Sequence, residues 1–143
     1  MATNKDRFYK AFTKVHQMIF KMTRGRLLGK LRGMPAAIVE TTGRRSGQRR
    51  ETMLTCPIVE PDRVVVIASY YGDSRHPAWF LNLRANPDVV VTMQGSTRRM
   101  TAHIANDEEK AAIWPKVVAS SPPYAKYQQK TDRDIPVVFL EPT

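Results

Sequence analysis

Residues 36–50 read AAIVETTGRRSGQRR, so that an apolar run passes directly into a basic turn. The β-branched first half is typical of a strand, and the glycines at 43 and 47 indicate a tight turn after it. Four arginines crowd the turn, and guanidinium groups bind phosphate or carboxylate through paired hydrogen bonds. The turn is therefore expected to hold a polyanion. Three interpretations remain open: a solvated basic loop, a site for a phosphorylated cofactor, and a site for nucleic acid.

The positive charge of the protein is concentrated in this turn and before it. The net charge is +10, of which residues 1–50 carry +11 and residues 51–143 carry −1. Residues 5–22 place apolar side chains at helical spacing with lysines on the other face, which predicts an amphipathic helix. This helix either packs on the domain or lies on an anionic membrane surface. We expect a basic helix and connector over 1–34 and a single domain over 35–143.

Composition limits the remaining possibilities. A chain of 143 residues with 42% apolar residues is typical of one globular domain. A single cysteine, Cys56, excludes an internal disulfide and is expected to be buried, and three widely separated histidines predict no metal site. No apolar run approaches the roughly 18 residues of a spanning helix, and no signal-peptide pattern follows the N-terminus. The expectation is a cytoplasmic protein.

Beyond the basic turn, short strands outnumber helices. Strands are expected over 36–42, 51–59, 64–69, 88–93, 98–104 and 136–140, and helices over 77–85, 107–119 and 124–129. Turns at 60–62 and 94–96 join neighbouring strands. Adjacent short strands with few helices between them predict an α+β fold: a mostly antiparallel sheet or small barrel of about six strands with two or three flanking helices.

The expected strand over 64–69 ends abruptly in Ser69-Tyr70-Tyr71-Gly72, and the helix that follows carries Trp79. Flat aromatic surfaces beside small residues suit a planar ring system. The alternative for Trp79 is an ordinary core residue, and both interpretations stay open.

Two further tyrosines, Tyr124 and Tyr127, stand three residues apart and share one face if they are helical. They either satisfy a buried hydroxyl or stack on a substrate and donate a hydrogen bond to it. A tyrosine with an ordinary pKa of about 10 is a donor at neutral pH and a poor base. The sequence contains no recognisable Ser-His-Asp, Cys-His or paired-carboxylate arrangement, and no Rossmann or P-loop fingerprint.

Taken together and in order, these features resemble the deazaflavin-dependent nitroreductase and quinone reductase family of actinobacteria. The resemblance extends from about residue 36 to residue 142. It rests on TTGRRSGQRR at 41–50, DRVVVIAS at 62–69, PAWFLNLRANP at 77–87, WP at 114–115, the tyrosine pair at 124 and 127, and TDRDIP at 131–136.

The resemblance implies a split β-barrel that binds the deazaflavin coenzyme F420, whose phosphate and glutamate tail form a polyanion. It implies that the phosphate and tail are held by Arg44, Arg45, Ser46, Gly47, Gln48 and Arg50. It implies that the deazaflavin ring is lined by Thr52, Met53, Leu54, Ala68, Ser69, Tyr70, Tyr71, Trp79 and Asn82. Ser69, Tyr124 and Tyr127 are then the expected catalytic residues, facing the substrate.

Family resemblance also implies the reaction, which is hydride transfer from the reduced deazaflavin to a quinone or nitroaromatic acceptor. Such a protein positions and shields the reactants, which fits the lack of an acid–base constellation. Three departures from the nitroreductase pattern favour quinones: Thr52-Met53 after the arginine turn, Tyr70-Tyr71-Gly72 in place of Lys-Gly-Gly, and Ser121 in place of a tyrosine. A membrane-dissolved quinone would also suit a basic amphipathic N-terminus.

Two other functions compete. An oxidoreductase of the same barrel class could use FMN, although FMN has no polyglutamate tail to occupy four arginines. A non-catalytic basic module binding nucleic acid or anionic membrane would explain the charge of residues 1–50, but not the buried strand that ends at Ser69. We therefore expect a small-molecule substrate and no nucleic-acid partner.

Overall fold

The computed structural model describes Lys14, Met18, Lys30, Leu31 and residues 34–143. Lys14 and Met18 are helical and exposed. The rest of the helix expected over 5–22, and with it most of the expected boundary region before residue 34, lies outside the described residues.

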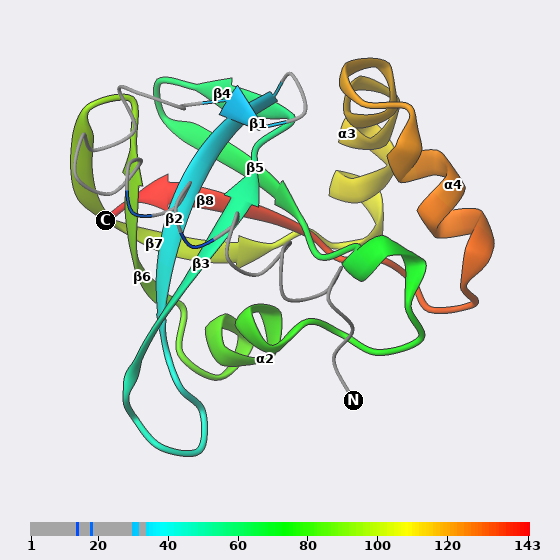
Figure 1. The fold of residues 1–143 in the computed structure, drawn as a ribbon. Helices are drawn as coiled ribbons and strands as arrows, with labels where there is room; N and C mark the ends of the chain where they lie inside the picture. Colours follow the sequence, from blue (N-terminus) through cyan, green and yellow to red (C-terminus); the bar gives the residue numbers. More distant parts are fainter. Residues whose placement is uncertain (1–13, 15–17, 19–29, 32–33) are drawn as a thin grey trace.

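Strands dominate the described part of the chain (Figure 1). They are β1 (Lys30–Leu31), β2 (Met34–Thr42), β3 (Arg49–Thr55), β4 (Ile58–Glu60), β5 (Arg63–Ile67), β6 (Asp88–Met93), β7 (Ser96–Ile104) and β8 (Val137–Pro142). Every pairing among them is antiparallel. The antiparallel sheet is confirmed, and the strands lie close to the expected positions except for the one expected over 51–59.

The sheet curls into a split barrel. Strand order runs β3–β2–β6–β7–β8–β5–β4, with β1 also paired to β2. The two end strands, β3 and β4, are consecutive in sequence and are separated by Cys56 and Pro57. The single strand expected over 51–59 is therefore divided in two at this point, where Pro57 cannot donate a backbone hydrogen bond. In the described residues β3 pairs with β2 alone, so its other edge is open.

Side chains along β5 and β8 point alternately to the two faces of the sheet, and each face packs against its own apolar layer. Val64 and Val66 point into the barrel interior with Val138 and Leu140, against Trp79 and Phe80. The residues between them on the same two strands face the opposite layer, formed by Val65, Ile67, Val137, Phe139, Ile113, Val117 and Tyr124. Because side chains alternate along a strand, a strand buried on both faces reads as a continuous apolar run. The sequence of β5 has that form, and Cys56 is buried as expected.

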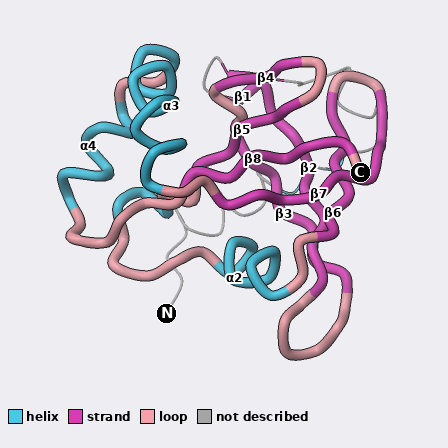
Figure 2. The backbone as a smooth tube through the Cα atoms, turned by 180° about the vertical axis from the view of Figure 1, so that it is seen from behind, coloured by secondary structure: helices cyan, strands magenta, loops and turns pink. Residues whose placement is uncertain are grey.

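The helices lie at two places around the barrel (Figures 1 and 2). α2 (Ala78–Ala85) lies near the base of the long β2–β3 hairpin, whereas α3 (Asp107–Ser120) and α4 (Pro123–Lys130) lie together at the far side. α3 begins with a capping box, in which Asn106 and Glu109 each bind the other's backbone N–H. The short turn η1 (Tyr70–Gly72) connects β5 to α2 and contacts α4.

Candidate functional site

The arginine turn forms the tip of the β2–β3 hairpin. Its backbone closes on itself, because Gly43 N–H donates to the Gln48 carbonyl (2.7 Å) and Gly47 N–H to the Gly43 carbonyl (2.8 Å). The Gln48 N–H donates to the Ser46 hydroxyl (3.2 Å). With these amides occupied inside the turn, the groups presented outward are guanidinium side chains. Ser46, Gly47 and Gln48 thus shape the turn.

Asn82 of α2 anchors this hairpin to the barrel. Its Oδ1 accepts from both the backbone N–H and Nη1 of Arg44 (3.1 and 3.2 Å), and its Nδ2 donates to Thr41 Oγ1 (3.3 Å). Asn82 and Thr41 are both buried. Buried amides of this kind require partners, so the bonds fix the base of the hairpin relative to α2.

Most of the arginine side chains remain available at the surface. Arg44, Arg45, Arg49 and Arg50 are all exposed. Arg49 forms an ion pair with Glu40 (3.0 Å), whereas Arg45 and Arg50 form none with another described residue. Arg44, Arg45 and Arg50 thus have no carboxylate partner among the described residues, and cations in that state are suited to an external anion.

A second unusual feature stands at the end of β5. Tyr70, Tyr71 and Gly72 have φ angles of 45°, 56° and 79°, which places three consecutive residues in the left-handed region. Non-glycine residues rarely adopt this conformation, and consecutive ones are rarer still. Both tyrosine rings are exposed, at 42% and 58%. Strained backbone of this kind persists only where surrounding contacts hold it.

Arg133 supplies the main restraint on this turn. Its guanidinium donates to the carbonyls of Ala68 (3.0 Å), Ser69 (2.8 Å) and Asp73 (3.1 Å), and Nη1 lies 3.0 Å from Nδ1 of His76. Burial lowers the pKa of Arg133 below its usual range. Since a guanidinium can only donate, His76 Nδ1 is the acceptor in this bond. Burial, followed by the positive charges of Arg133 and Arg84, lowers the pKa of His76.

Three tyrosine rings form a chain from this turn to β3. The ring of Tyr71 lies 5.9 Å from that of Tyr127, which lies 6.0 Å from that of Tyr124, and both pairs are edge-to-face. The Tyr124 hydroxyl is hydrogen-bonded to Thr55 Oγ1 at the end of β3 (2.9 Å). Tyr124 is buried, Tyr127 is half-buried and Tyr71 is exposed, so the chain leads from the core to the surface.

β3 therefore connects two chemically different ends. Its first residue, Arg49, adjoins the arginine turn, and its last, Thr55, bonds to Tyr124. A strand of this length spans about 20 Å between them. From Thr52 onward the side chains of β3 are half-buried. The edge of β3 away from β2 pairs with no other described strand, so among the described residues its backbone donors and acceptors are left for a ligand. This edge suits an elongated ligand with an anionic tail and a flat polar ring.

The predicted ring-lining residues differ in how far they reach this surface. Thr52, Met53 and Leu54 lie on β3 and are half-buried, as is Ser69, whereas Tyr70 and Tyr71 are exposed. Ala68 and Trp79 belong to the barrel core, and Asn82 is occupied by Arg44 and Thr41. Their contact with a ligand ring remains a prediction.

Four residues at the site carry no prediction from the sequence: Arg133, Thr55, Thr41 and His76. Arg133 stands within TDRDIP at 131–136 as a lone cation just before a strand buried on both faces. A cation next to a buried strand needs hydrogen-bond acceptors, and this position was the signal from which a structural role of Arg133 could have been predicted. Thr41 and Thr55 gave none, because a threonine in a strand is ordinary.

Other features of the surface lie away from β3. One hollow is lined by Pro35, Cys56, Pro57, Val59, Glu60, Pro61, Gln94, Ser96 and Arg98, and another lies between α3 and α4 near Trp114. Neither includes a predicted site residue. We place the candidate site on β3 because the arginine turn adjoins its first residue and Tyr124 is hydrogen-bonded to its last. Among the described residues no group of three or more His, Cys, Asp and Glu could hold a metal ion.

Comparison with known proteins addresses the family. Residues 12–142 match the family model of F420H2-dependent quinone reductases. The chain belongs to the F420H2-dependent quinone reductase family. An F420H2-dependent quinone reductase of Mycobacterium tuberculosis is 35% identical over 131 residues, covering 89% of this chain and 87% of that protein. The family resemblance seen in the sequence is confirmed.

Solved structures agree with this family assignment. A structure described as an F420H2-dependent reductase (FDR-A) is 39% identical, with a TM-score of 0.67, over 75% of this chain and 94% of that one. Another, described as a domain-swapped dimer, is 32% identical with a TM-score of 0.71, over 94% of this chain and 99% of that one. The predicted split-barrel α+β fold is thereby confirmed. No helix in the described part of the chain is long and apolar enough to cross a membrane.

Proposed function

We propose that this protein is an oxidoreductase that uses reduced coenzyme F420 to reduce a quinone. One structural observation supports the proposal most strongly: exposed arginines adjoin one end of β3, Tyr124 is bonded to the other end, and no described strand covers the edge between them. Coenzyme F420 has the matching form, with a phosphate and glutamate tail at one end and a deazaflavin ring at the other. When bound, the cofactor supplies a hydride and so a two-electron reduction.

Each part of the site has a task in this proposal. Arg44, Arg45 and Arg50 bind the phosphate and tail through charge-assisted hydrogen bonds. The half-buried side chains of Thr52, Met53 and Leu54 support the ring, and the open edge of β3 offers hydrogen bonds to its polar rim. The tyrosines at the other end exclude water from one side of the ring. The protein thus binds and orients two reactants.

The direct test measures the equilibrium binding of F420 and, separately, of FMN. Tryptophan fluorescence reports the binding. We expect F420 to bind and FMN to bind at least tenfold more weakly, because FMN lacks the tail that the arginines accept. Arg44→Ala with Arg50→Ala should weaken F420 binding about a hundredfold, and rising salt should weaken the wild type more than this variant.

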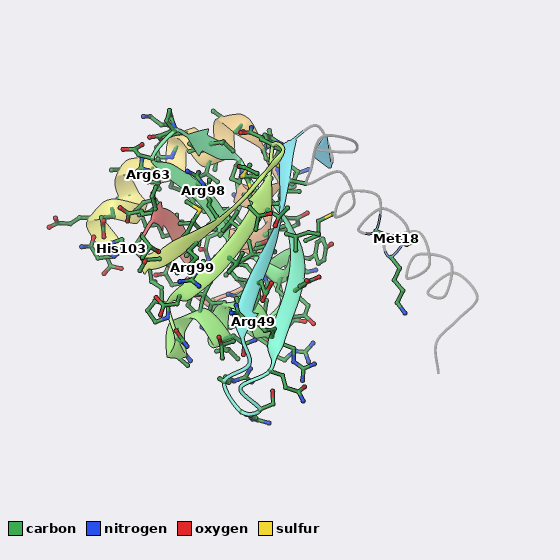
Figure 3. All side chains as sticks on the ribbon, turned by 90° about the vertical axis from the view of Figure 1, so that its left-hand side faces the viewer. Met18, Arg49, Arg63, Arg98, Arg99 and His103 are labelled. Atoms are coloured by element: carbon green, nitrogen blue, oxygen red, sulfur yellow. The ribbon has the colours of Figure 1, made fainter. Side chains whose placement is uncertain are left out.

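Arg99→Ala is the matched control for this experiment. Arg99 is an exposed arginine on β7, and Figure 3 shows it apart from Arg49 at the hairpin. Its loss should leave F420 binding unchanged. Preferential binding of FMN would keep the fold and replace the cofactor, whereas binding of neither would leave a basic binding module.

Ser69, Tyr124 and Tyr127 are proposed to contact the acceptor, with a hydroxyl stabilising charge that develops on its oxygen. Tyr124 is tested first, because its hydroxyl is already bonded to Thr55 and its ring is buried, so it would have to exchange this bond for one to the acceptor. Tyr124→Phe should lower kcat for quinone reduction about tenfold or more. An unchanged kcat would remove Tyr124 from this role, and Ser69→Ala and Tyr127→Phe would then be measured in the same assay.

We further propose that the basic segment over 5–22 attaches the protein to the anionic inner face of the cell membrane, where lipid-soluble quinones occur. The concentration of charge in residues 1–50 supports this proposal. Co-sedimentation with vesicles containing 30% phosphatidylglycerol, compared with neutral vesicles, tests it. Equal recovery with both vesicle types would contradict it, as would binding that survives deletion of residues 1–29.

A further inference from the structure

One amide side chain joins α4 to the segment before β8. Gln128 of α4 accepts at Oε1 from the Ile135 N–H (3.0 Å), and its Nε2 donates to the Arg133 carbonyl (2.8 Å). Its Oε1 also accepts from Lys110 Nζ of α3 (2.9 Å). Since the N–H and the ammonium group can only donate and the carbonyl can only accept, these partners allow one orientation of the amide. Gln128 therefore holds the segment 133–136 at two points.

Lys110 keeps this amide in place. Its side chain is 16% exposed, its ammonium group also bonds the Asp134 carboxylate, and it lies 4.9 Å from the centre of the Trp114 ring. A largely buried cation is costly unless partners replace its water, and here the amide oxygen, the carboxylate and the ring do so. The segment 133–136 is thus tied to α3 as well as to α4.

The same segment runs beside the end of β5. The Pro136 carbonyl accepts from the Ala68 N–H (3.0 Å), and the Arg133 guanidinium donates to the carbonyls of Ala68 (3.0 Å) and Ser69 (2.8 Å). The peptide groups on both sides of Ala68 are therefore bonded to the segment that Gln128 holds. Because hydrogen bonds tolerate only small changes in distance and angle, a shift of this segment on α4 would also shift Ser69.

We propose that Gln128 is a positioning residue for quinone reduction, which sets the place of Ser69 by holding the segment 133–136. The inference rests on the proposed function, in which Ser69 contacts the acceptor, and it adds a residue whose amide is bonded within the protein itself. Positioning of this kind matters for the rate, because a displacement of about 1 Å at a reacting group can lower the rate about a hundredfold.

Gln128→Glu removes the donor of this amide and keeps its acceptor. The carboxylate can still accept from Lys110 and from the Ile135 N–H, whereas its second oxygen would face the Arg133 carbonyl, which also only accepts. The segment should therefore move, and kcat for quinone reduction should fall about tenfold or more. The Kd of F420 is measured for each variant, and kcat at saturating F420, because Ser69 is also an expected contact of the cofactor ring.

Two controls separate this role from added charge and from lost stability. Gln129, the next residue of α4, is exposed and has no hydrogen bond to another described residue, so Gln129→Glu should leave kcat within about twofold. Arg63 pairs with Glu60 (3.1 Å) at the other end of β5. Arg63→Gln should lower the denaturation midpoint and leave kcat within about twofold. A fall in kcat as large as that of Gln128→Glu in either control would overturn the proposal.

A double-mutant cycle tests whether the effect passes through Ser69. Gln128→Glu and Ser69→Ala together should lower kcat no more than the larger single change does, because both act on one hydroxyl group. Independent losses would instead multiply, as expected if Gln128 acted only through general stability. Multiplied losses would overturn the positioning role.

Amide hydrogen exchange tests the same contacts without cofactor or quinone. Corrected for global stability, the Ala68 N–H should exchange about fivefold faster or more in Gln128→Glu and at an unchanged rate in Gln129→Glu, because its bond to the Pro136 carbonyl is weakened only in the first. Unchanged exchange in Gln128→Glu would overturn the positioning role even if the protein reduces quinones with F420. Faster exchange in a protein that binds no F420 would contradict the proposed function alone.

Discussion

The arginine turn, residues 43–48, precedes β3, whereas the tyrosine turn, Tyr70–Gly72, follows β5 and is linked to the other end of β3 only through the rings of Tyr127 and Tyr124. The two turns are built in opposite ways. The arginine turn is exposed, closes with its own amides and is anchored to the barrel by the side chain of Asn82. The tyrosine turn is clamped by Arg133, pressed against α4 and holds two non-glycine residues in a strained conformation. An arginine side chain can bind an anion from a range of positions because charges interact over several ångströms, so the arginine turn does not need a rigid backbone. Side chains that contact a reactant by shape must be held in one position, as those of the tyrosine turn are.

Two glycines give the sharpest test of this contrast, since both have positive φ. A Cβ atom added at Gly47 (φ +71°) would have no atom within 4 Å, whereas one added at Gly72 (φ +79°) would collide with backbone. Gly47→Ala should cost about 1 kcal/mol of unfolding free energy from conformation alone. Gly72→Ala should cost about 3 kcal/mol, because a clash adds to the strain. Denaturant unfolding midpoints with unchanged m-values measure both.

Equal losses at the two glycines would contradict the claim that the tyrosine turn is the more tightly held. A large loss at Gly47 and a small one at Gly72 would reverse the comparison.

Much of the fold follows from the sequence because its signals are local. The apolar run of β5 and the Gln94-Gly95 hairpin, where both residues have positive φ, are set by neighbouring residues. The acidic start of α3 is likewise local. The family resemblance added the cofactor and the split barrel, which no local pattern specifies.

The restraints within the site were not predictable in the same way. Arg133 binds carbonyls 60 to 65 residues earlier in the chain, and a backbone carbonyl carries no sequence identity. Nothing in a Tyr-Tyr pair indicates a left-handed conformation, since tyrosine has no intrinsic preference for it. Asn82 was expected beside the cofactor ring, but its amide is used by Arg44 and Thr41, which only the folded arrangement reveals.

Asn82 provides the intermediate test, because its side-chain amide links α2 to the arginine turn. Asn82→Ala should cost about 2 kcal/mol, since it leaves the buried Thr41 hydroxyl and the Arg44 amide without this partner. F420 affinity should fall only about threefold, because the guanidinium groups remain. Asn86→Ala is the control: Asn86 also accepts a backbone N–H, from Asp88 (3.1 Å), but that bond is exposed, so about 0.5 kcal/mol is expected. A loss of F420 binding as large as that of the arginine variants would make Asn82 a direct ligand contact.

The smallest expected effect is a pH dependence confined to the tyrosine turn. Burial, followed by the charges of Arg133 and Arg84, lowers the pKa of His76 below its usual 6.5. The unfolded chain therefore binds the proton more readily than the folded one, so the contribution of His76 to stability is complete above about pH 6.5 and declines as the pH falls toward the lowered pKa. Protonation would also replace the Nδ1 acceptor of Arg133 with a like charge.

Hydrogen exchange over 68–76, corrected for the intrinsic effect of pH, should thus accelerate between pH 7 and pH 5, while exchange over 43–48 should not. His76→Gln retains an acceptor but does not titrate, so this variant should remove the pH dependence and keep the clamp. Acceleration that persists in His76→Gln would assign the effect to another group. An arginine turn that responded equally would show that the two ends of β3 are coupled, because His76 has no described contact with the hairpin.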